Sequence, residues 1–509
     1  MNPDAKSPSR ASVRQGPVRS ILWVVLALCV ARLWLMPLPS SFWADETATA
    51  FVVHHGAADP SLAVAPQVPD SIYYALPKTA EKLLGFSEAA YRLPSVLVML
   101  IALWVIAQLG ANLIHPAAGW MAVFTCLALQ GFNDQAADAR PYGLGTCVGV
   151  LSLWFLIRWL DRGRWGDAAA FVVMGALLWR VHLIFWPFYL VLAVYPIVRL
   201  IRRDTPVRWL QAAGVFLVLG LLLVPVIQDA RFIYRQAPQH VIAQMPTLRN
   251  LFYSLHLGMI AGFLAGAALL ARWRGWLFRG WNISPAALAL MLGWWLCQPI
   301  CLFLFSWITG NSLFVKRYLF LSLPGAAFLA TAMVAPFVPD RAWKPVSALV
   351  GIGVLGLLGS WNQVWPEHRH SRMREAAQAI NGIQDLRAST PILCLSPFVE
   401  ARVPAWNPDY SPRGFLYAQL DVYPLRGKIY PFPLEISPEV EKYAARLANE
   451  ILPGSGRFVI YGSEANTLYW RDWFAARTEL AGWRTQSLGS FGDLQAIMFE
   501  TPAPLSGLK

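Results

Sequence analysis

The sequence has few charged residues and few cysteines for its length. Only 14% of its 509 residues are charged, whereas 56% are hydrophobic. This small number of charged residues cannot cover the surfaces of several water-soluble domains. We therefore expect a polytopic α-helical membrane protein. The six cysteines show no C-x-x-C spacing, and five of them lie in apolar runs. This pattern argues against a disulfide framework and against a zinc or redox site.

The charge that is present is mainly positive. The formal net charge is +13, which by itself is compatible with nucleic-acid binding. Most lysines and arginines, however, fall between apolar runs, where they are typical of topology signals and lipid-headgroup contacts. We therefore expect membrane lipids as partners and no nucleic acid.

The apolar runs predict about eleven transmembrane helices, counted at roughly 20 residues per crossing. They are expected near 21–38, 94–114, 117–133, 142–160, 167–180, 182–200, 208–228, 250–271, 284–308, 317–337 and 345–361. The first run is longer than the apolar core of a signal peptide, so it is interpreted as an uncleaved helix that follows a basic tail at 1–20.

Basic residues in five segments alternate consistently with these spans. Besides the tail, the segments contain Arg158, Arg162 and Arg164; Arg199, Arg202, Arg203 and Arg208; Arg272, Arg274 and Arg279; and Arg341 and Lys344. With a cytoplasmic N-terminus all five are cytoplasmic, as the positive-inside rule requires. We expect the plasma (inner) membrane as the location, with the loop 39–93 and everything after 361 on the extracytoplasmic side.

Two neighbouring carboxylates, Asp45 and Glu46, follow the first span directly. An ionisable pair at that depth is costly unless it lines a wet cavity or carries out chemistry. The alternative is that the pair only caps a short helix expected at 47–55. His54 and His55 could bind a divalent metal with the carboxylates, but two neighbouring residues of a regular helix cannot both face one ion. No cofactor is therefore certain, and a metal stays an alternative.

Several motifs of the outer loops resemble one known family when they are taken together. They are the acidic pair at 45–46, Ile-Tyr-Tyr at 72–74, Leu-Gly-Phe-Ser-Glu-Ala-Ala-Tyr-Arg-Leu-Pro-Ser at 84–95, Ala-Arg-Pro-Tyr at 139–142 and Lys-Arg-Tyr at 316–318. In this combination the chain resembles the GT-C glycosyltransferases, within the branch of protein O-mannosyltransferases and the lipid A aminoarabinose transferase. Members often carry Pro-Pro before Tyr-Tyr, whereas this chain has Pro69-Asp70-Ser71.

The resemblance implies transfer of a sugar from a polyprenyl-phosphate-linked donor to a glycan, lipid or protein acceptor on the extracytoplasmic face. A phosphate leaves readily when cations hold its developing charge. The acceptor hydroxyl needs a base, and Asp45 is the expected one. Glu46 projects about 100° away on a helix and is expected to orient the acceptor or a cation. A single displacement would invert the anomeric centre.

Further candidates for substrate binding lie at the outer ends of the spans. They are Arg92, Asp138, Arg140, Tyr142, Lys316, Arg317 and Tyr318. The cations are expected to bind the donor phosphate, because an excess of basic residues is unusual on the outer side. The alternative for Arg140 is a salt bridge to Asp138 or Asp134, and the alternative for Lys316 and Arg317 is contact with lipid headgroups.

The composition changes after residue 361 to a mixed polar sequence, which predicts one small extracytoplasmic α/β domain at 362–509. Strands are expected near 391–395, 428–430, 457–461 and 494–499, and helices near 372–380, 438–450 and 466–478. Residues 21–361 would form the transmembrane domain.

Two other functions remain open. A flippase or transporter of lipid-linked sugars usually has internal repeats and ionisable residues at mid-bilayer, and neither is evident here. A polysaccharide polymerase or ligase would share the carrier, the membrane and the long outer loops.

Overall fold

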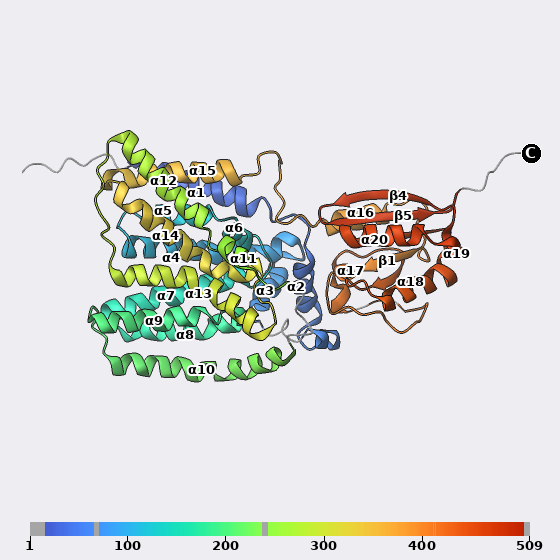
Figure 1. Cartoon of the computed structure of the whole chain (residues 1–509), viewed down its shortest axis with the longest axis horizontal. Coiled ribbons are helices and arrows are strands. Elements are labelled where there is room, and N and C mark those ends of the chain that lie inside the picture. Colours follow the sequence, from blue (N-terminus) through green and yellow to red (C-terminus); the bar gives the residue numbers. More distant parts are fainter. Residues whose placement is uncertain (1–15, 66–70, 237–242, 411, 413, 503–509) are drawn as a thin grey trace, which may run out of the picture.

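The computed structural model describes residues 16–65, 71–236, 243–410, 412 and 414–502. A helical part, from α1 to α15, is followed along the chain by an α/β part, from α16 to β5 (Figure 1). Most of the basic tail expected at 1–20, and Asp70, lie outside the described residues.

Long apolar helices make up the helical part. Among the described residues, eight stretches are long and apolar enough to cross a membrane. Seven of them contain α4 (Glu88–Leu113), α7 (Tyr142–Arg162), α9 (Phe188–Arg202), α12 (Leu257–Arg274), α13 (Pro285–Thr309), α14 (Leu323–Val334) and α15 (Trp343–Leu358). The eighth, Trp209–Gln228, is the larger part of α10 (Trp209–Gln236). The polytopic helical architecture expected from composition is therefore confirmed.

The three remaining expected spans are helical but shorter. They correspond to α1 (Gly16–Val30) with a π-helical turn at Ala31–Leu35, to α5 (Gly119–Leu127) with α6 (Gln130–Ala136), and to α8 (Trp165–Val181). The number of eleven spans accordingly stays a prediction.

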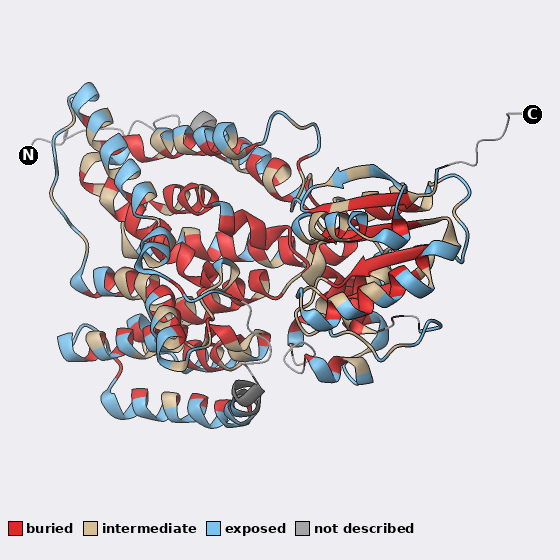
Figure 2. Cartoon of the chain, turned by 45° about the vertical axis from the view of Figure 1, so that its right-hand side comes forward, coloured by how far each residue is buried: buried red, intermediate tan, exposed pale blue. Residues whose placement is uncertain are grey.

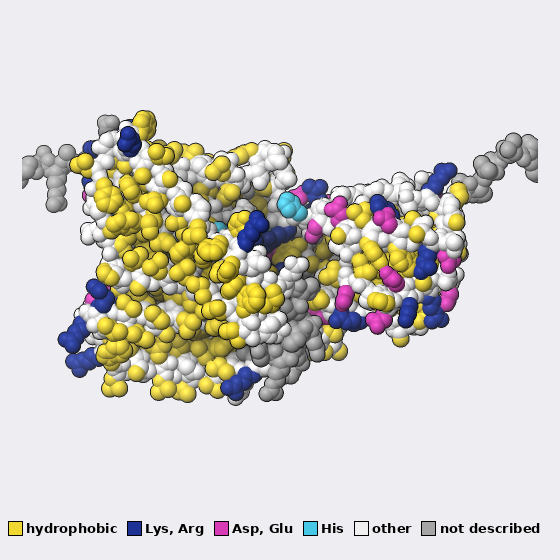
Figure 3. Space-filling view, in the orientation of Figure 1, with side chains coloured by type: hydrophobic (Ala, Val, Ile, Leu, Met, Phe, Trp, Pro, Cys, Tyr) yellow, Lys and Arg dark blue, Asp and Glu magenta, His cyan; other side chains and the backbone are white. Residues whose placement is uncertain are grey.

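The surface of the helical part is apolar, as contact with lipid requires. Leu210 and Leu217 on α10 are 85% and 63% exposed, and Leu269 on α12 is 67% exposed. Hydrophobic side chains cover the visible face of this part, whereas Lys and Arg gather at its ends (Figure 3). Buried residues fill the interiors of the bundle and of the sheet (Figure 2). The chain is therefore an integral membrane protein.

The basic connections between the helices share the end of the bundle that is remote from the α/β part (Figure 1). Ion pairs join neighbouring connections there, including Arg158 to Asp167 at 3.0 Å and Arg279 to Asp340 at 3.1 Å. The first outer loop and the α/β part share the opposite end.

Short helices fold the first outer loop. They are α2 (Ala44–His55), the 3₁₀ turns Pro60–Val64 and Ile72–Tyr74, and α3 (Ala75–Leu84). The Glu46 carboxylate accepts a hydrogen bond from the Trp43 backbone N–H at 3.3 Å, so the acidic pair does begin α2, as the sequence predicted. Gly85 ends α3 at a φ of 80°, a conformation that glycine adopts without steric cost.

The α/β part has a five-stranded sheet in the order β2-β1-β3-β5-β4. The strands are β1 (Pro391–Leu395), β2 (Lys428–Phe432), β3 (Arg457–Ser463), β4 (Arg484–Phe491) and β5 (Leu494–Glu500). β1 is parallel to β2 and β3, whereas β5 is antiparallel to β3 and β4. The four expected strands are confirmed. The edge strand β4 was missed, because its sequence RTQSLGSF is largely exposed and has no apolar alternation.

Alternate residues of the strands face two helical layers. Leu393 and Leu395 pack with α18 (Pro438–Glu450) and α20 (Glu464–Ala475), whereas Ile392 and Cys394 pack with α16 (Met373–Asn381). This alternation follows from the two-residue period of a strand. The three helices expected in the tail are confirmed.

Polar contacts attach the α/β part to the first outer loop. Arg374 pairs with Glu88 at 2.9 Å, and the Tyr423 hydroxyl donates to the same carboxylate at 2.9 Å. The Tyr423 hydroxyl also accepts from the Phe42 backbone N–H at 2.9 Å, and α17 (Ala418–Val422) packs on α2. The α/β part therefore rests directly on the segment that carries the acidic pair.

Arg32 fixes the connection that leaves the last helix of the bundle. Its guanidinium, at the end of the first span, donates to the carbonyl oxygens of Gly359, Ser360, Gln363 and Val364 at 2.5–2.9 Å. Hydrogen bonds from a charged donor to several carbonyls hold an irregular segment in one path. Residues 359–372, called the connecting segment below, leave the bundle along this path.

Candidate active site

Asp45 and two arginines meet at the end of the bundle beneath the α/β part. The Asp45 Oδ2 atom lies 3.4 Å from Arg317 Nη2 and 3.9 Å from Arg140 Nη2. This oxygen is buried and accepts no hydrogen bond among the described residues, although the side chain as a whole is 19% exposed. Three residues expected from three separate outer loops are thus brought together.

Arg140 holds both the side chain and the backbone of Asp45. Its Nη1 atom donates to the Asp45 carbonyl oxygen at 3.0 Å and lies 3.4 Å from the Thr49 hydroxyl. Among the described residues, the ion-pair partner of Arg140 is therefore Asp45, and not Asp138 or Asp134 as in the alternative drawn from the sequence. Arg140 fixes the first turn of α2 against the turn that precedes α7.

A cavity of about 240 Å³ opens beside Arg317, between the helical part and the α/β part. Its lining includes Trp43, Lys316, Arg317, Arg369, His370 and Asp493. Lys316 and Arg317 begin the 3₁₀ helix η6 (Lys316–Ser322), which leads into α14. We call this space the junction cavity. One of its lining residues, Arg317, is the ion-pair partner of Asp45.

Trp43 lies between two guanidinium groups at the wall of the junction cavity. Arg317 is 5.7 Å and Arg369 is 5.1 Å from the centroid of the Trp43 ring. The indole N–H donates to Asp138 Oδ1 at 3.1 Å. Cation–π contacts of this kind stabilise positive charge on an aromatic face, so Trp43 connects the two arginines in one arrangement.

Asp138 is fully buried behind Trp43. His368 Nε2 lies 3.6 Å and Arg369 Nη2 3.3 Å from its carboxylate, and Arg369 Nη1 lies 3.5 Å from Asp134. Burial alone would raise the pKa of Asp138, but His368, Arg369 and the Trp43 indole outweigh burial and hold this pKa well below its ordinary value. Asp138 is thus an ionised anchor for Trp43 and Arg369, with no surface left for a substrate.

Arg369 and His368 were missed by the sequence analysis. Both lie in the connecting segment, where no helical or strand period marks them. One signal was available, because Arg369, Arg372 and Arg374 put positive charge on a segment that should lie outside, where basic residues are depleted. That signal does not tell which of the three reaches the bundle.

Glu46 and Arg92 form an ion pair in which neither side chain is exposed. Arg92 Nε and Nη2 donate to the two Glu46 oxygens at 2.7 and 2.5 Å, and the Ala139 backbone N–H donates to Glu46 at 2.8 Å. Arg92 also donates to the carbonyl oxygens of Ser40 and Ser41 at 2.6 and 2.9 Å. The pair ties α4, α2 and the segments on either side of them together, and it presents no atom to the junction cavity.

Tyr142 and Tyr318 belong to an aromatic cluster below the arginines. The centroid of the His182 ring lies 5.7 Å from that of Tyr142 and 5.8 Å from that of Tyr318. Tyr142 is only 1% exposed, whereas the Tyr318 ring also lies 5.4 Å from the Arg317 guanidinium. Tyr142 and Tyr318 are close in sequence to Arg140 and Arg317, so the packing of these rings stabilises the backbone that carries the two arginines.

A divalent cation has one potential ligand set in the described residues, formed by Glu46, Asp138 and His368, whose ligand atoms lie within 4.8 Å of one another. The carboxylates of this set already accept from Arg92 and Arg369, and a cation there would have to displace a guanidinium. These residues therefore fit a metal poorly.

The two histidines considered from the sequence lie at the other end of α2, about 14 Å along the helix from Asp45 at 1.5 Å per residue. His54 Nε2 lies 3.3 Å from Glu81, and His55 Nε2 lies 2.9 Å from Asp421. They do not form a common site with Asp45.

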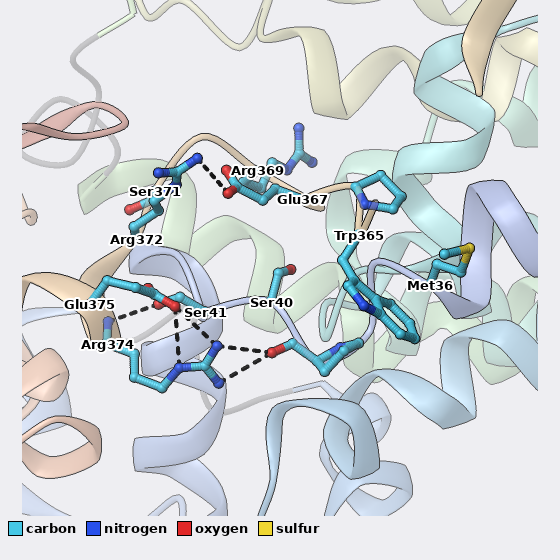
Figure 4. Close-up of a pocket in the computed structure, with 12 residues that line it drawn as sticks. Met36, Ser40, Ser41, Trp365, Glu367, Arg369, Ser371, Arg372, Arg374 and Glu375 are labelled. Atoms are coloured by element: carbon cyan, nitrogen blue, oxygen red, sulfur yellow. Dashed lines mark hydrogen bonds and ion pairs between the residues drawn. The ribbon is translucent and has the colours of Figure 1, made fainter. Parts of the chain in front are cut away.

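A second cavity, of about 370 Å³, also borders the connecting segment (Figure 4). Its arginines have carboxylate partners, since Arg372 pairs with Glu367 at 2.6 Å and Arg374 pairs with Glu375 at 3.0 Å. Among the described residues, two carboxylates, Glu367 and Glu375, line the second cavity and one, Asp493, lines the junction cavity, so the second cavity is less suited to an anion.

Comparisons with known proteins agree with this geometry. Residues 72–227 match the family model described as dolichyl-phosphate-mannose-protein mannosyltransferase. The crystal structure of ArnT from Cupriavidus metallidurans in the apo state is similar with a TM-score of 0.54 at 14% identity, covering 94% of this chain and 97% of that one. The same protein bound to undecaprenyl phosphate gives a TM-score of 0.55 at 14% identity, covering 97% and 99%. No curated protein matches the chain.

The family match and the shared fold confirm the resemblance that the motifs suggested. Residues 72–227 fit the model of the mannosyltransferase family, and the chain as a whole has the fold of ArnT. This shared fold extends over nearly the whole length of the chain, including the α/β part.

Proposed function

We propose that this protein transfers one sugar from a polyprenyl-phosphate-linked donor to an acceptor hydroxyl, in the junction cavity beside Asp45. The observation that carries the proposal is the contact of the Asp45 carboxylate with Arg317, which lines the same cavity as Lys316. A structural relative that holds undecaprenyl phosphate supports this choice of carrier.

The charges beside the junction cavity suit an anionic donor. One carboxylate, Asp45, faces the two guanidiniums of Arg140 and Arg317, and the exposed Lys316 adds a third positive charge. A polyprenyl-phosphate sugar is a phosphodiester with one negative charge, so it would balance part of the surplus. The planar fork of Arg317 can bind two phosphate oxygens, and Lys316 can bind a third as a point charge.

Asp45 serves as the base once the donor is bound. A phosphate on Arg317 competes for the guanidinium that now faces Asp45 Oδ2, an oxygen that accepts no hydrogen bond from the residues the structure describes. The acceptor oxygen then attacks the anomeric carbon, its proton passes to Asp45, and the bond from that carbon to the phosphate oxygen breaks. The cations hold the charge that develops on the leaving polyprenyl phosphate. One displacement inverts the anomeric centre.

Glu46 and Arg92 act on the fold rather than on the substrates in this mechanism. Their buried pair holds the first turn of α2, and with it the position of Asp45. Asp138 and Arg369 likewise hold the Trp43 side chain in its position.

The location of the site supports an extracytoplasmic reaction. The basic connections lie at the end of the bundle away from the α/β part, so the positive-inside rule assigns that end, and the N-terminus, to the cytoplasm. The junction cavity and the α/β part are then extracytoplasmic, at the level where the phosphate of a membrane-embedded carrier would lie.

The decisive experiment uses Asp45→Asn protein in detergent with radiolabelled undecaprenyl-phosphate sugars and a panel of lipid, glycan and peptide acceptors. We expect the variant to bind undecaprenyl phosphate and to lose transfer by a factor of about 100 or more, within the usual range for removal of a general base. Asp472→Asn, which changes an exposed pair with Arg471 in the α/β part, is the matched control. Transfer by Asp45→Asn at the normal rate would refute the assignment.

The products distinguish the other functions. One labelled sugar per acceptor supports the proposal, chain growth would identify a polymerase, and movement of the lipid-linked sugar across the bilayer without bond formation would identify a flippase.

A further inference from the structure

The tight turn between β4 and β5 reaches the junction cavity from the α/β part. Asp493, in this turn, lines the cavity together with Lys316 and Arg317 of the helical part. Part of the cavity lining is therefore supplied by a segment that lies far later in the sequence. The mechanism above makes no use of this carboxylate.

Backbone contacts fix the turn to the connecting segment. The Asp493 N–H donates to the His370 carbonyl oxygen at 3.0 Å, and the Arg372 N–H donates to the Phe491 carbonyl oxygen at 3.2 Å. Ser371 and Gly492 form an antiparallel bridge between these two bonds. Gly492 has a φ of 77°, and a Cβ atom there would lie 1.2 Å from the His370 carbonyl oxygen. Only glycine fits this position.

The connecting segment is itself fixed to the bundle by the residue before His370. Arg369 reaches Asp134 and Asp138 and lies on the Trp43 ring. A continuous series of contacts thus leads from the buried acids of the bundle to the turn that holds Asp493. A carboxylate on a backbone that is fixed in this way can recognise a bound molecule, because little backbone ordering entropy remains to be lost on binding.

The charged residues that line the junction cavity distinguish the phosphate end of the donor from its sugar end. Asp493 is exposed, and in the part of the chain that the structure describes no cation lies within ion-pairing distance of its carboxylate. A carboxylate only accepts hydrogen bonds, so it repels a phosphate and binds hydroxyl or amino donors. The volume of about 240 Å³ suits a single sugar ring rather than a longer glycan.

We propose that Asp493 binds hydroxyl or amino groups of the sugar being transferred, and that the β4–β5 turn is a specificity-determining wall of the site. The cations of η6 hold the phosphate end of the donor, and Asp493 holds the sugar end. This inference rests on the proposed function, since it requires the donor to occupy the junction cavity.

The test compares binding of undecaprenyl phosphate with binding of undecaprenyl phosphate that carries a sugar. The sugar is chosen from mannose, glucose, a pentose and an amino sugar as the one that wild-type protein binds most tightly. For Asp493→Ala we expect about 10-fold weaker binding of the glycosylated carrier, because a hydrogen bond to a charged group contributes roughly 1.5–3 kcal/mol. The sugar-free carrier should bind at least as well as it does to wild type, because a repelling charge has been removed. Asp472→Ala is the control for loss of an exposed carboxylate.

Two glycine variants test the same idea through the backbone. Gly492→Ala should reproduce the selective loss, because its Cβ atom displaces the turn. Gly482→Ala is the matched control, because Gly482 also has a positive φ, of 83°, but a Cβ atom added there would meet no other atom within 4 Å. It should therefore strain the backbone without moving Asp493.

The inference is overturned if Asp493→Ala binds both carriers as wild type does, or weakens both equally. Failure of the proposed function gives a different result: wild-type protein would bind neither carrier if the donor were of another kind, and a flippase or polymerase would bind the carriers but give the other products described above.

Discussion

The pair of Glu46 and Arg92 gives the sharpest test of how the two neighbouring carboxylates divide their roles. We consider Glu46→Gln, which keeps the shape of the side chain and removes its charge. Arg92 would then be a fully buried cation without its counter-ion, and only one of its two hydrogen bonds to this side chain, at 2.7 and 2.5 Å, could keep an oxygen acceptor. The amide nitrogen of Gln would also direct a donor at another donor. Removal of one partner from a buried pair costs about 3–5 kcal/mol.

The loss should appear first as lower thermal stability of the detergent-solubilised protein, measured by unfolding on heating. Glu450→Gln is the control, because Glu450 pairs with Arg446 at 2.7 Å but both side chains are about half exposed. Exposed pairs of this kind contribute about 0–1 kcal/mol. Asp45→Asn should lose transfer with a smaller loss of stability than Glu46→Gln, because its pairs with Arg140 and Arg317 are longer and partly exposed and Arg140 keeps its bond to the Asp45 carbonyl oxygen.

Transfer by Glu46→Gln should fall in parallel with the folded fraction and recover at low temperature, where more protein is folded. A Glu46→Gln protein with wild-type stability and no transfer at any temperature would refute the reasoning. Glu46 would then act on the acceptor or on a cation, as the sequence analysis first expected.

Two further predictions concern the junction cavity and the metal. Arg317→Ala should weaken binding of undecaprenyl phosphate about 10-fold or more, because a charge-assisted contact is lost. The control Arg279→Ala, at the opposite end of the bundle, should bind undecaprenyl phosphate normally. Equal binding by both variants would contradict the assignment of the phosphate to Arg317. Treatment with a chelator should leave transfer unchanged, because the carboxylates of Glu46 and Asp138 already accept from guanidiniums; loss of transfer that an added divalent cation restores would contradict this expectation.

The sequence predicted Asp45, Arg140 and Arg317 as candidates because each stands at the outer end of an apolar run. Runs that alternate across a membrane put these ends on one side, so residues far apart in sequence become neighbours. Their contacts at 3.4 and 3.9 Å follow from the helix packing that this alternation permits. What the sequence could not give is which carboxylate of the pair faces the cavity, because adjacent helical positions differ only by their direction.

The sequence did not predict Arg369 and Asp493 as residues of the site, for a different reason. Their positions depend on how the α/β part rests on the bundle, which polar contacts such as Arg374 to Glu88 decide. No hydrophobic period encodes such contacts. The bridge that fixes Asp493 joins an irregular segment to the turn after β4, a strand whose exposed polar sequence gave no strand pattern.

The two neighbouring acids, Asp45 and Glu46, have different environments, and this difference preserves the positive charge of the junction cavity. If Asp45 and Glu46 both faced the junction cavity, their charges would cancel those of Arg140 and Arg317, and an anionic donor would gain little from Lys316 alone. Instead Arg92 neutralises Glu46 inside the protein, where the pair also fixes α2. The cavity keeps its surplus of positive charge, and Asp45 is the acid of the pair that contacts the lining residue Arg317. Asp493 lines the cavity without pairing with one of these cations among the described residues, so its negative charge favours binding of the phosphate at the cations and not at the β4–β5 turn.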